Sequence, residues 1–479
     1  MTGAGRYLVV GFGVTGKAVA AWARAQGAEA VVVEDRPNPA SEAAAGELGV
    51  EFVGRPSPDR LAELVASADV VVPSPGVPVE HPVFDLAARA GRPVLSEIEL
   101  ACSRLDPHRG LEGHRGLEGH SGGPPRLVAI TGTNGKTTVT TLVTAMLCAS
   151  GVDAIAGGNI GRPLIEAVGE GASVVVAEVS SFQLQFTDRF HPRVSCWLNL
   201  TEDHLDWHPD LGHYAAAKAR VWARQQAGDT AVYALGDPVV AASAATLAPG
   251  VRRIGFALDD PAAAYHVEGD RLCSDEVGAF LDVAELPRAL PHDLTNSLAA
   301  AAVARAAGAG WDGIAEALRA TAPLAHRVQL VGEGAGVAWY DDSKATTPAS
   351  VLAAVAGFGS VVLIAGGRNK GLDLDALGNT VPPVRAVIAI GESAGEVEAA
   401  FEGRAPVVRA ASMPEAVESA AGAARPGDAV VLSPGAASFD WYGSYGERGD
   451  HFASLVRARP EIGQNETPDP PNDVQKGSR

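Results

Sequence analysis

The segment TGTNGKTT, residues 131–138, restricts the possible folds of this chain more than any other. It follows an apolar run and precedes an apolar-periodic stretch at 139–149, an order that predicts a strand, a loop and a helix. Small residues let backbone N–H groups approach phosphates, Lys136 can reach the β- and γ-phosphate oxygens, and Thr137 can ligate Mg²⁺. Because Ile130 replaces the first glycine of the strict G-x4-GK[ST] pattern, a glycine-rich turn with an exposed lysine is the alternative. The segment predicts an α/β domain that binds a nucleoside triphosphate.

A second glycine motif, GFGVTG at residues 11–16, stands between a strand expected at 7–10 and a helix expected at 15–26. Glu34 and Asp35 follow about twenty residues later at the end of the next strand, which is the spacing of a dinucleotide-binding fingerprint. The motif predicts that a diphosphate-bearing nucleotide can lie on a helix N-terminus, without specifying NAD. A tight turn that binds no ligand is the alternative.

The order of apolar strands and helices predicts an α/β protein with mostly parallel sheets. A length of 479 residues suggests roughly three domains. Strands are expected at 7–10, 30–33, 70–72, 127–130, 174–177, 196–198, 337–340, 361–365, 386–390 and 429–432, with a further helix over 296–307. The predicted divisions are a Rossmann-like domain at 1–105, a linker at 106–125, a central phosphate-loop domain at 126–322, a second Rossmann-like domain at 323–460 and a disordered tail at 461–479.

The predicted linker, DPHRGLEGHRGLEGHSGGPP, contains a tandem copy of HRGLEG and has no apolar periodicity. This composition is typical of a flexible linker or a surface insertion. His108, His114 and His120 recur within it, so a metal site is conceivable. The linker interpretation is preferred because no cluster of carboxylates or cysteines joins these histidines.

The net charge of −19 argues against a general nucleic-acid binder and against docking on an anionic membrane. The four cysteines are far apart and form no CxxC pair, which is typical of reduced thiols in a cytoplasmic protein. The N-terminus lacks the features of a signal peptide, and no run of 18 apolar residues could insert into a bilayer. A cytoplasmic protein is therefore expected.

Acidic and histidine side chains follow two of the expected strands. Glu178 follows the run at 174–177, and Asp203 and His204 follow the strand at 196–198. Ligands of parallel α/β sheets bind at the carboxyl ends of the strands, so these residues are expected to face the phosphate loop. Together with Thr137 they form a set of oxygen and nitrogen ligands that suits Mg²⁺.

Two further features leave their interpretation open. Lys218 lies in a predicted helix, where a lone lysine is usually solvated. DDSKATTP at 341–348 follows a predicted strand and lies shortly after His326 and Arg327. It fits a third loop that binds a phosphate or a carboxylate, and an ordinary strand–helix turn capped by Ser or Thr is the alternative.

The chain resembles the Mur ligases in a series of motifs that occur in the order of that family. They are TGTNGKTT, GGNIG (157–161), EVSSFQL (178–184), NLTEDHLDWH (199–208), HDLTNSLAA (292–300), HR (326–327), DDSKATTP and LSPGAASFD (432–440). The resemblance spans residues 11 to about 455, and DDSKAT is similar to the branch that adds D-glutamate. It implies that the first domain binds UDP rather than NAD, that the second binds ATP and Mg²⁺, and that the third closes over the site and contacts D-glutamate.

The resemblance also implies roles for individual residues, the catalytic ones being Lys136, Glu178, His204 and Lys218. ATP contacts are expected from Gly132, Thr133, Asn134, Gly135, Lys136, Thr137, Thr138, Asn296, Arg327 and Asp342. UDP-substrate contacts are expected from Gly13, Thr15, Glu34, Asp35, Arg36, Gly76, Asn159, Ser180 and Gln183. D-glutamate contacts are expected from Lys344, Thr346, Ser438, Phe439 and Tyr445. Two Mg²⁺ ions are expected on Thr137, Glu178, His204 and a carbamylated Lys218, whereas the role of Lys370 stays open because AGGRNKG departs from the family's usual version.

The implied reaction joins D-glutamate to UDP-N-acetylmuramoyl-L-alanine through an acyl phosphate formed with ATP. The enzyme is expected to act in peptidoglycan precursor synthesis as a monomer. Another Mur ligase or a folylpolyglutamate synthase is the nearest alternative. A NAD-dependent oxidoreductase would leave TGTNGKTT unexplained, and a non-catalytic nucleotide-binding protein would leave Glu178 and His204 without a function.

Overall fold

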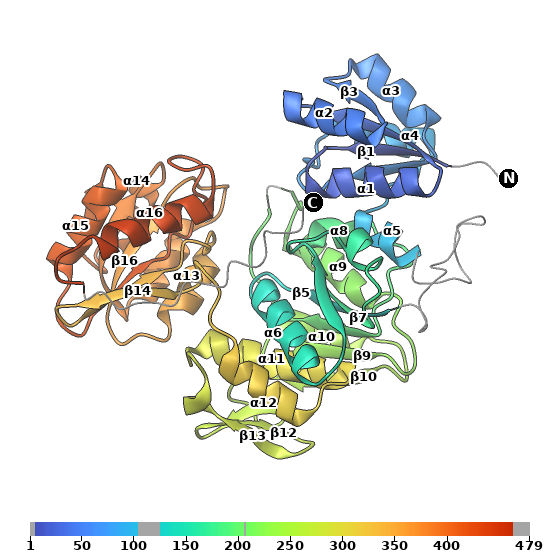
Figure 1. The fold of residues 1–479 in the computed structure, drawn as a ribbon. Coiled ribbons are helices and arrows are strands. Elements are labelled where there is room, and N and C mark those ends of the chain that lie inside the picture. The colour runs from blue at the N-terminus through green and yellow to red at the C-terminus, as the bar shows by residue number, and fades with distance from the viewer. Residues whose placement is uncertain (1–4, 104–124, 206, 463–479) are drawn as a thin grey trace. The chain divides into compact units, whose positions relative to one another are not determined.

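The computed structural model describes residues 5–103, 125–205 and 207–462. The chain divides into two compact units, Met1–Ala322 and Pro323–Arg479 (Figure 1). The predicted linker lies outside the described residues apart from Pro125, so its histidines have no structural account. No described helix is long and apolar enough to cross a bilayer.

The first unit begins with a parallel sheet whose described strands have the order β3-β2-β1-β4. Valines dominate these strands, and the sheet is covered on both faces, as expected of a parallel sheet. The strands are β1 (Arg6–Val10), β2 (Glu29–Glu34), β3 (Glu51–Gly54) and β4 (Val70–Pro73). The helices are α1 (Val14–Ala25), α2 (Pro39–Leu48), α3 (Pro58–Ser67), α4 (Pro82–Ala90) and α5 (Glu97–Ser103).

A larger mixed sheet forms the rest of this unit, with the described order β13-β12-β11-β10-β9-β8-β5-β7-β6. Its strands are β5 (Arg126–Thr131), β6 (Ala154–Gly158), β7 (Val174–Glu178), β8 (Val194–Trp197), β9 (Thr230–Ala234), β10 (Arg252–Phe256), β11 (Tyr265–Glu268), β12 (Arg271–Ser274) and β13 (Gly278–Asp282). Its helices are α6 (Lys136–Ala149), α7 (Leu164–Ala167), α8 (Ser181–Gln185), α9 (Leu211–Ala219), η1 (Arg220–Trp222), α10 (Pro238–Ala245), η2 (Val283–Glu285), α11 (Pro291–Ala307) and α12 (Trp311–Ala320).

The central strand β5 shows how this sheet separates two cores. Leu127 and Ala129 pack into one apolar cluster, whereas Val128 and Ile130 pack into another on the opposite face. Side chains of a strand alternate between faces, so a continuous apolar run is buried on both sides. The sheet order places the carboxyl ends of β8, β5, β7 and β6 next to one another.

The segment that begins α5 joins the small sheet to the larger one. Both carboxylate oxygens of Glu99 accept hydrogen bonds from the consecutive backbone amides of Asp188, Arg189 and Phe190 at 2.8–3.0 Å. The backbone amide of Ser96 also donates to the Phe186 carbonyl at 2.9 Å. These contacts fix the small sheet against the turn that follows α8.

The second unit contains a sheet with the described order β14-β15-β19-β16-β17-β18, in which only the β14 pairing is antiparallel. Its strands are β14 (Gln329–Gly334), β15 (Val337–Asp341), β16 (Val361–Gly366), β17 (Val384–Ile390), β18 (Val407–Ala410) and β19 (Ala429–Leu432). Its helices are α13 (Pro348–Val355), η3 (Leu374–Thr380), α14 (Ala394–Phe401), α15 (Met413–Ala423) and α16 (Tyr445–Arg457). The predicted class of mostly parallel α/β sheets is confirmed.

The last two described residues lie within the predicted tail. Glu461 and Ile462 belong to the packed chain, because Ile462 is buried in the core of the second unit. A Cβ atom on Gly332 would lie 2.6 Å from Ile462 Cγ2, so β14 and this residue are in close contact.

Replacing Arg385 with methionine is expected to lower the free energy of unfolding of the second unit by about 2–3 kcal/mol at neutral pH. The Arg385 guanidinium lowers the pKa of the buried Asp428 carboxyl to about 2. This ion pair joins β17 to the residue that precedes β19. A depressed carboxyl pKa stabilises the fold above the unfolded-state value, so the difference should narrow as pH falls from about 4 toward 2. Urea unfolding measures it, and Asp428→Asn in the same background should recover part of the loss.

Candidate functional site

The TGTNGKTT loop connects β5 to α6, as its sequence predicts. The loop uses left-handed backbone at Gly135 (φ +83°), where a Cβ atom would lie 2.6 Å from Asn296 Oδ1. Only glycine fits both the conformation and the approach of α11. The predicted ATP residue Asn296 is therefore in contact with the loop. Thr137 and Thr138 lie in the first turn of α6, whose N–H groups make this helix end an anion-binding position.

The segment after β8 clamps the phosphate loop. Asn199 accepts a hydrogen bond from the Asn134 amide at 2.9 Å and returns one to the Asn134 carbonyl at 3.2 Å. Thr133 Oγ1 accepts from the Thr201 amide at 3.0 Å and from the Tyr214 hydroxyl at 3.3 Å. Sequence reasoning did not single out Asn199, Thr201 or Tyr214, although Asn199 and Thr201 lie within the NLTEDH motif.

Two lysines converge on the same loop. Lys136 Nζ donates to the Gly132 and Thr133 carbonyls at 2.9 and 2.7 Å, and Lys218 Nζ donates to the Gly132 carbonyl at 2.8 Å. Lys218 comes from α9 and is 1% exposed, so it is not the solvated helix lysine that its sequence context suggests. Burial, assisted by the nearby Lys136 charge, lowers the pKa of Lys218 well below its usual value, and Asp203 opposes this shift.

Glu178 ends β7 beside the loop and is 3% exposed. Its Oε1 accepts a hydrogen bond from Asn159 Nδ2 at 3.0 Å, whereas Oε2 is buried without a hydrogen-bond partner among the described residues. An unpaired buried carboxylate oxygen is costly unless it coordinates a cation. The oxygen donors Glu178 and Thr137 thus fit Mg²⁺, an ion that usually takes only one or two carboxylates and completes its shell with phosphate oxygens and water.

His204 follows β8 in a left-handed conformation (φ +56°). Its backbone amide donates to Asp203 Oδ1 at 2.8 Å, and Nε2 lies 3.3 Å from Asp203 Oδ2. Its ring contacts Phe182 and Tyr214, with centroid separations of 4.7 and 6.1 Å. Within the part of the chain that the structure describes, no three His, Cys, Asp or Glu side chains gather as a metal cluster.

The GFGVTG turn connects β1 to α1. A Cβ atom on Gly16 would lie 2.0 Å from the Gly11 carbonyl oxygen, so this position admits only glycine, whereas Gly13 has open space around it. The Glu34 carboxylate accepts hydrogen bonds from the Phe12 amide at 2.8 Å and the Arg36 amide at 3.0 Å. It thus fixes the shape of the turn. Asp35 lies 3.1 Å from His81 Nε2 at the same end of the sheet.

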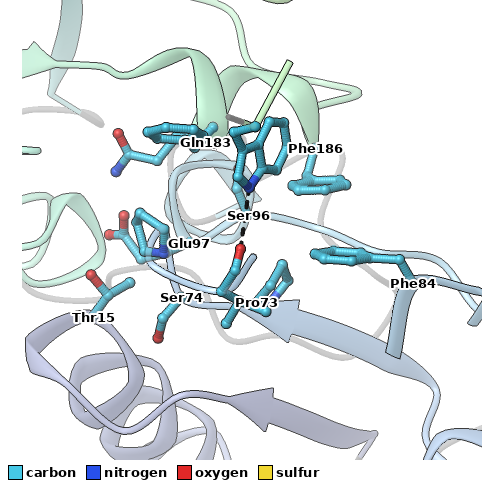
Figure 2. A pocket seen from close by; sticks show the side chains of 12 residues that line it. Thr15, Pro73, Ser74, Phe84, Ser96, Glu97, Gln183 and Phe186 are labelled. Atoms are coloured by element: carbon cyan, nitrogen blue, oxygen red, sulfur yellow. Dashed lines mark hydrogen bonds between the residues drawn. The ribbon is translucent and has the colours of Figure 1, made fainter. Parts of the chain in front are cut away.

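A pocket lies between the small sheet and α8 (Figure 2). Ser180 caps α8, and its amide and hydroxyl both donate to Gln183 Oε1 at 3.0 Å, which orients the Gln183 side chain. Gly76, in the turn after β4, has open space where a Cβ atom would stand. The pocket is lined by Thr15, Pro73, Ser74, Pro75, Val77, Phe84, Ser96, Glu97, Phe182, Gln183, Phe186 and Trp207. It brings together Thr15 and Gln183, which the sequence places far apart.

In the second unit, DDSKATTP lies at the end of β15. Its two aspartates are buried and form hydrogen bonds with residues 326–328 and with Ser433. His326 Nδ1 lies 2.6 Å from Asp341 Oδ2, and this hydrogen bond raises the pKa of His326. Asp342 accepts from the Ser433 hydroxyl at 2.6 Å and the Val328 amide at 3.2 Å. Burial raises the pKa of Asp342 to about 7, although both donors oppose the change. The predicted ATP residue Arg327 lies close enough to add an opposing charge.

Arg448, which sequence reasoning missed, ties this loop to LSPGAASFD. Its guanidinium is buried and donates to the Ser343 hydroxyl and carbonyl at 2.9 and 2.8 Å and to the Ala436 carbonyl at 3.2 Å. Burial lowers the pKa of Arg448 to about 10. A lone arginine in a polar helix gives no signal of such a position in a sequence.

Three of the predicted D-glutamate residues, Lys344, Phe439 and Tyr445, take part in cation–aromatic pairs, one of which includes Lys370, whose role the sequence left open. Lys344 Nζ lies 3.9 Å from the centre of the Tyr445 ring, and Lys370 Nζ lies 5.5 Å from that of Phe439. Both rings are exposed, whereas Ser438 is buried and Thr346 is half-buried. Both lysines follow strands of this sheet, Lys344 after β15 and Lys370 after β16.

Three family models match the chain. They are the Mur ligase MurD-like N-terminal domain over residues 5–96, the Mur ligase middle domain over 130–304 and the Mur ligase glutamate ligase domain over 326–435. Each of the three sheets lies almost entirely within a different one of these matches.

Individual proteins are similar over nearly the whole chain. The UDP-N-acetylmuramoylalanine--D-glutamate ligase of Frankia casuarinae is 42% identical over 469 residues, covering 94% of this chain and 94% of that protein. The protein of the same name from Syntrophus aciditrophicus is 35% identical, covering 95% and 98%. MurF from Acinetobacter baumannii has a TM-score of 0.59 at 16% identity, covering 94% and 93%. A pseudomurein peptide ligase type C from Methanothermus fervidus has a TM-score of 0.58 at 15% identity, covering 95% and 99%. These two structures indicate a shared fold.

Proposed function

The chain belongs to the Mur ligase family, and on this basis we propose that it joins D-glutamate to UDP-N-acetylmuramoyl-L-alanine with consumption of ATP. This reaction is a step of peptidoglycan precursor synthesis. The observation that carries the proposal is the 42% identity, over 94% of both chains, to a ligase named for this reaction. The loops DDSKATTP and LSPGAASFD, which resemble those of the branch that adds D-glutamate, follow the neighbouring parallel strands β15 and β19 and so lie at one edge of the sheet.

In the first step the alanyl carboxylate attacks the γ-phosphorus of ATP, which releases ADP and forms an acyl phosphate. Carboxylate and triphosphate repel each other, so the barrier is mainly electrostatic. Lys136, at the end of the phosphate loop, and the N–H groups in the first turn of α6 supply positive charge at this position. Asn199 and Thr201 hold the loop in one conformation, which reduces its reorganisation during the reaction.

In the second step the amine of D-glutamate attacks the acyl carbon, and phosphate leaves from the tetrahedral intermediate. Lys344 and Lys370 would bind the carboxylates of D-glutamate, with Tyr445 and Phe439 keeping the two ammonium groups in place. Arg448 holds the two loops that carry Lys344 and Phe439.

The family uses Mg²⁺, which neutralises charge on the triphosphate when bound. Glu178 and Thr137 would hold one ion, and His204 with a carbamylated Lys218 would hold a second. Lys218 supports this assignment because burial lowers the pKa of its amine and so favours the neutral form, which can add to CO₂, losing one proton and gaining an anionic oxygen. The amine itself is a cation or a neutral donor, whereas the carbamate offers the oxygen ligand that Mg²⁺ prefers.

The UDP-substrate would lie across the pocket of Figure 2, with its diphosphate at the N-terminus of α1. Thr15, Gln183 and Asn159 would contact it, and the Gly13–Arg36 region and Gly76 would accommodate the nucleotide. The candidate residues for all three substrates belong to one chain, which supports a monomer. A cytoplasmic location follows from the use of ATP and a UDP-linked precursor.

Release of ADP and phosphate tests the proposal. The assay contains UDP-N-acetylmuramoyl-L-alanine, ATP and Mg²⁺, with D-glutamate, L-glutamate, L-lysine or diaminopimelate added in turn. Turnover is expected with D-glutamate alone. Turnover with a different amino acid would retain a ligase but reject the acceptor. No turnover with any of them would favour a folylpolyglutamate synthase-like ligase or a non-catalytic nucleotide-binding protein.

A further inference from the structure

A buried carboxyl group, Glu97, lines the pocket between the small sheet and α8. The residue is 1% exposed. Its Oε1 accepts a hydrogen bond from the Ile165 amide at 2.5 Å, whereas Oε2 is buried and has no hydrogen-bond partner among the described residues. An unpaired carboxylate oxygen in such a place carries a large desolvation cost. The two steps of the proposed reaction give this group no function.

The position of Glu97 relates it to the anionic part of the substrate. Figure 2 shows its carboxyl group between Thr15, in the first turn of α1, and Gln183 of α8. Ser74, which follows β4, lines the same pocket. These residues surround the place where the proposed function puts the diphosphate. An ionised Glu97 would repel that group, whereas a protonated Glu97 could donate a hydrogen bond to it.

The charged groups around Glu97 favour its neutral form. No Lys, Arg or His is among the described residues that line the pocket. Burial raises the pKa of Glu97 to about 7, the amides of Ile165 and Leu164 oppose the shift, and Glu166 of α7 adds to it. On α5 itself, Glu99 is committed to three backbone amides, and burial raises the pKa of Cys102, which therefore stays a thiol.

We propose that Glu97 takes up one proton from solvent when the UDP-linked substrate binds, and that its Oε2–H then donates to a diphosphate oxygen. One O–H bond forms on Glu97 and no substrate bond breaks. Protonated Glu97, although it carries no charge, would thus help to recognise the diphosphate of the substrate by donating a hydrogen bond to it. This inference rests on the proposed function, because that function places a diphosphate in the pocket.

Proton uptake makes substrate affinity depend on pH with a definite sign. The bound diphosphate raises the pKa of the Glu97 carboxyl further. The affinity for the substrate is therefore highest at a pH where free Glu97 is already protonated, and it falls as pH rises through about 7. Between about pH 6 and about pH 8 the association constant should fall about tenfold. The substrate adds no slope of its own, because its diphosphate diester and its carboxylate stay ionised over this range.

Isothermal titration of the full chain with UDP-N-acetylmuramoyl-L-alanine, without ATP, tests the proposal. Measurement at about pH 8 in two buffers of different ionisation enthalpy gives the number of protons taken up, which should approach one. This result needs no variant. Binding with equal heats in the two buffers would overturn the inference while leaving the proposed function intact. No binding at all would instead contradict the proposed function itself.

Two variants assign the proton to its group. Glu97→Gln keeps an acceptor for the Ile165 amide and offers a permanent donor to the pocket, so uptake should vanish and affinity should become independent of pH. Glu166→Gln removes an exposed neighbouring charge and should move the midpoint of the wild-type pH curve to lower values. Proton uptake that persists in Glu97→Gln would overturn the assignment to Glu97.

Discussion

Replacing Lys136 with alanine is expected to lower the rate of ADP release by about a thousandfold, because the variant loses the cation that belongs to the phosphate loop itself. Lys136 Nζ lies against the Gly132 and Thr133 carbonyls at the start of α6, so its charge is already positioned. Charge develops on the transferred phosphoryl group during the reaction, and a preorganised cation stabilises that state more than it stabilises bound ATP. The loss should therefore appear mainly in kcat.

Two controls separate this effect from damage to the fold. Arg271→Ala removes an exposed cation of β12 in the same unit and should leave ADP release unchanged. Lys136→Arg keeps the charge but replaces a compact ammonium with a planar fork, so it should recover only part of the activity. Thermal unfolding should be similar for all three variants. Near-normal ADP release by folded Lys136→Ala would remove this lysine from the mechanism.

Apolar patterning was sufficient to predict most of the fold. Runs such as 174–177 and 361–365 are buried on both faces of parallel sheets, and such strands carry an almost continuous apolar signal. The region from β9 to β13 was not predicted. Strands β11 and β12 pair antiparallel over a few residues, and β13 is mostly exposed, so their sequences lack a long apolar run. The domain boundaries remain predictions.

Candidate site residues could be predicted from the sequence where they lie together in one short motif. The phosphate loop and DDSKATTP belong to this class, since each follows a strand directly. Glu97 and Arg448 belong to another class, because their partners lie 68 and 105 positions away in the sequence. Lys218 shows the difference most clearly: its helical context suggests a solvated lysine, and only the family resemblance singled it out. The structure buries it against Gly132, which no local pattern encodes.

Replacing Lys218 with alanine is expected to remove most activity, by about a hundredfold or more, through loss of an oxygen ligand to the second Mg²⁺. Depletion of dissolved CO₂ should lower wild-type activity, and added bicarbonate should restore it, because carbamylation requires CO₂. Bicarbonate should leave Lys218→Ala unchanged. Lys218→Arg serves as a matched control that keeps a cation but cannot form the carbamate, so it should be equally inactive.

A readout independent of activity distinguishes carbamylation from a merely structural lysine. With ¹³C-labelled bicarbonate, the wild-type protein should give a carbamate carbon resonance that is absent from Lys218→Ala. A structural role would predict loss of activity and of thermal stability without that resonance, since Lys218 Nζ also holds the Gly132 carbonyl. Full activity in Lys218→Ala would reject the second-ion role outright. The buried position of Lys218 disfavours its cationic form, which is why the proposed carbamylation is expected there and should depend on bicarbonate.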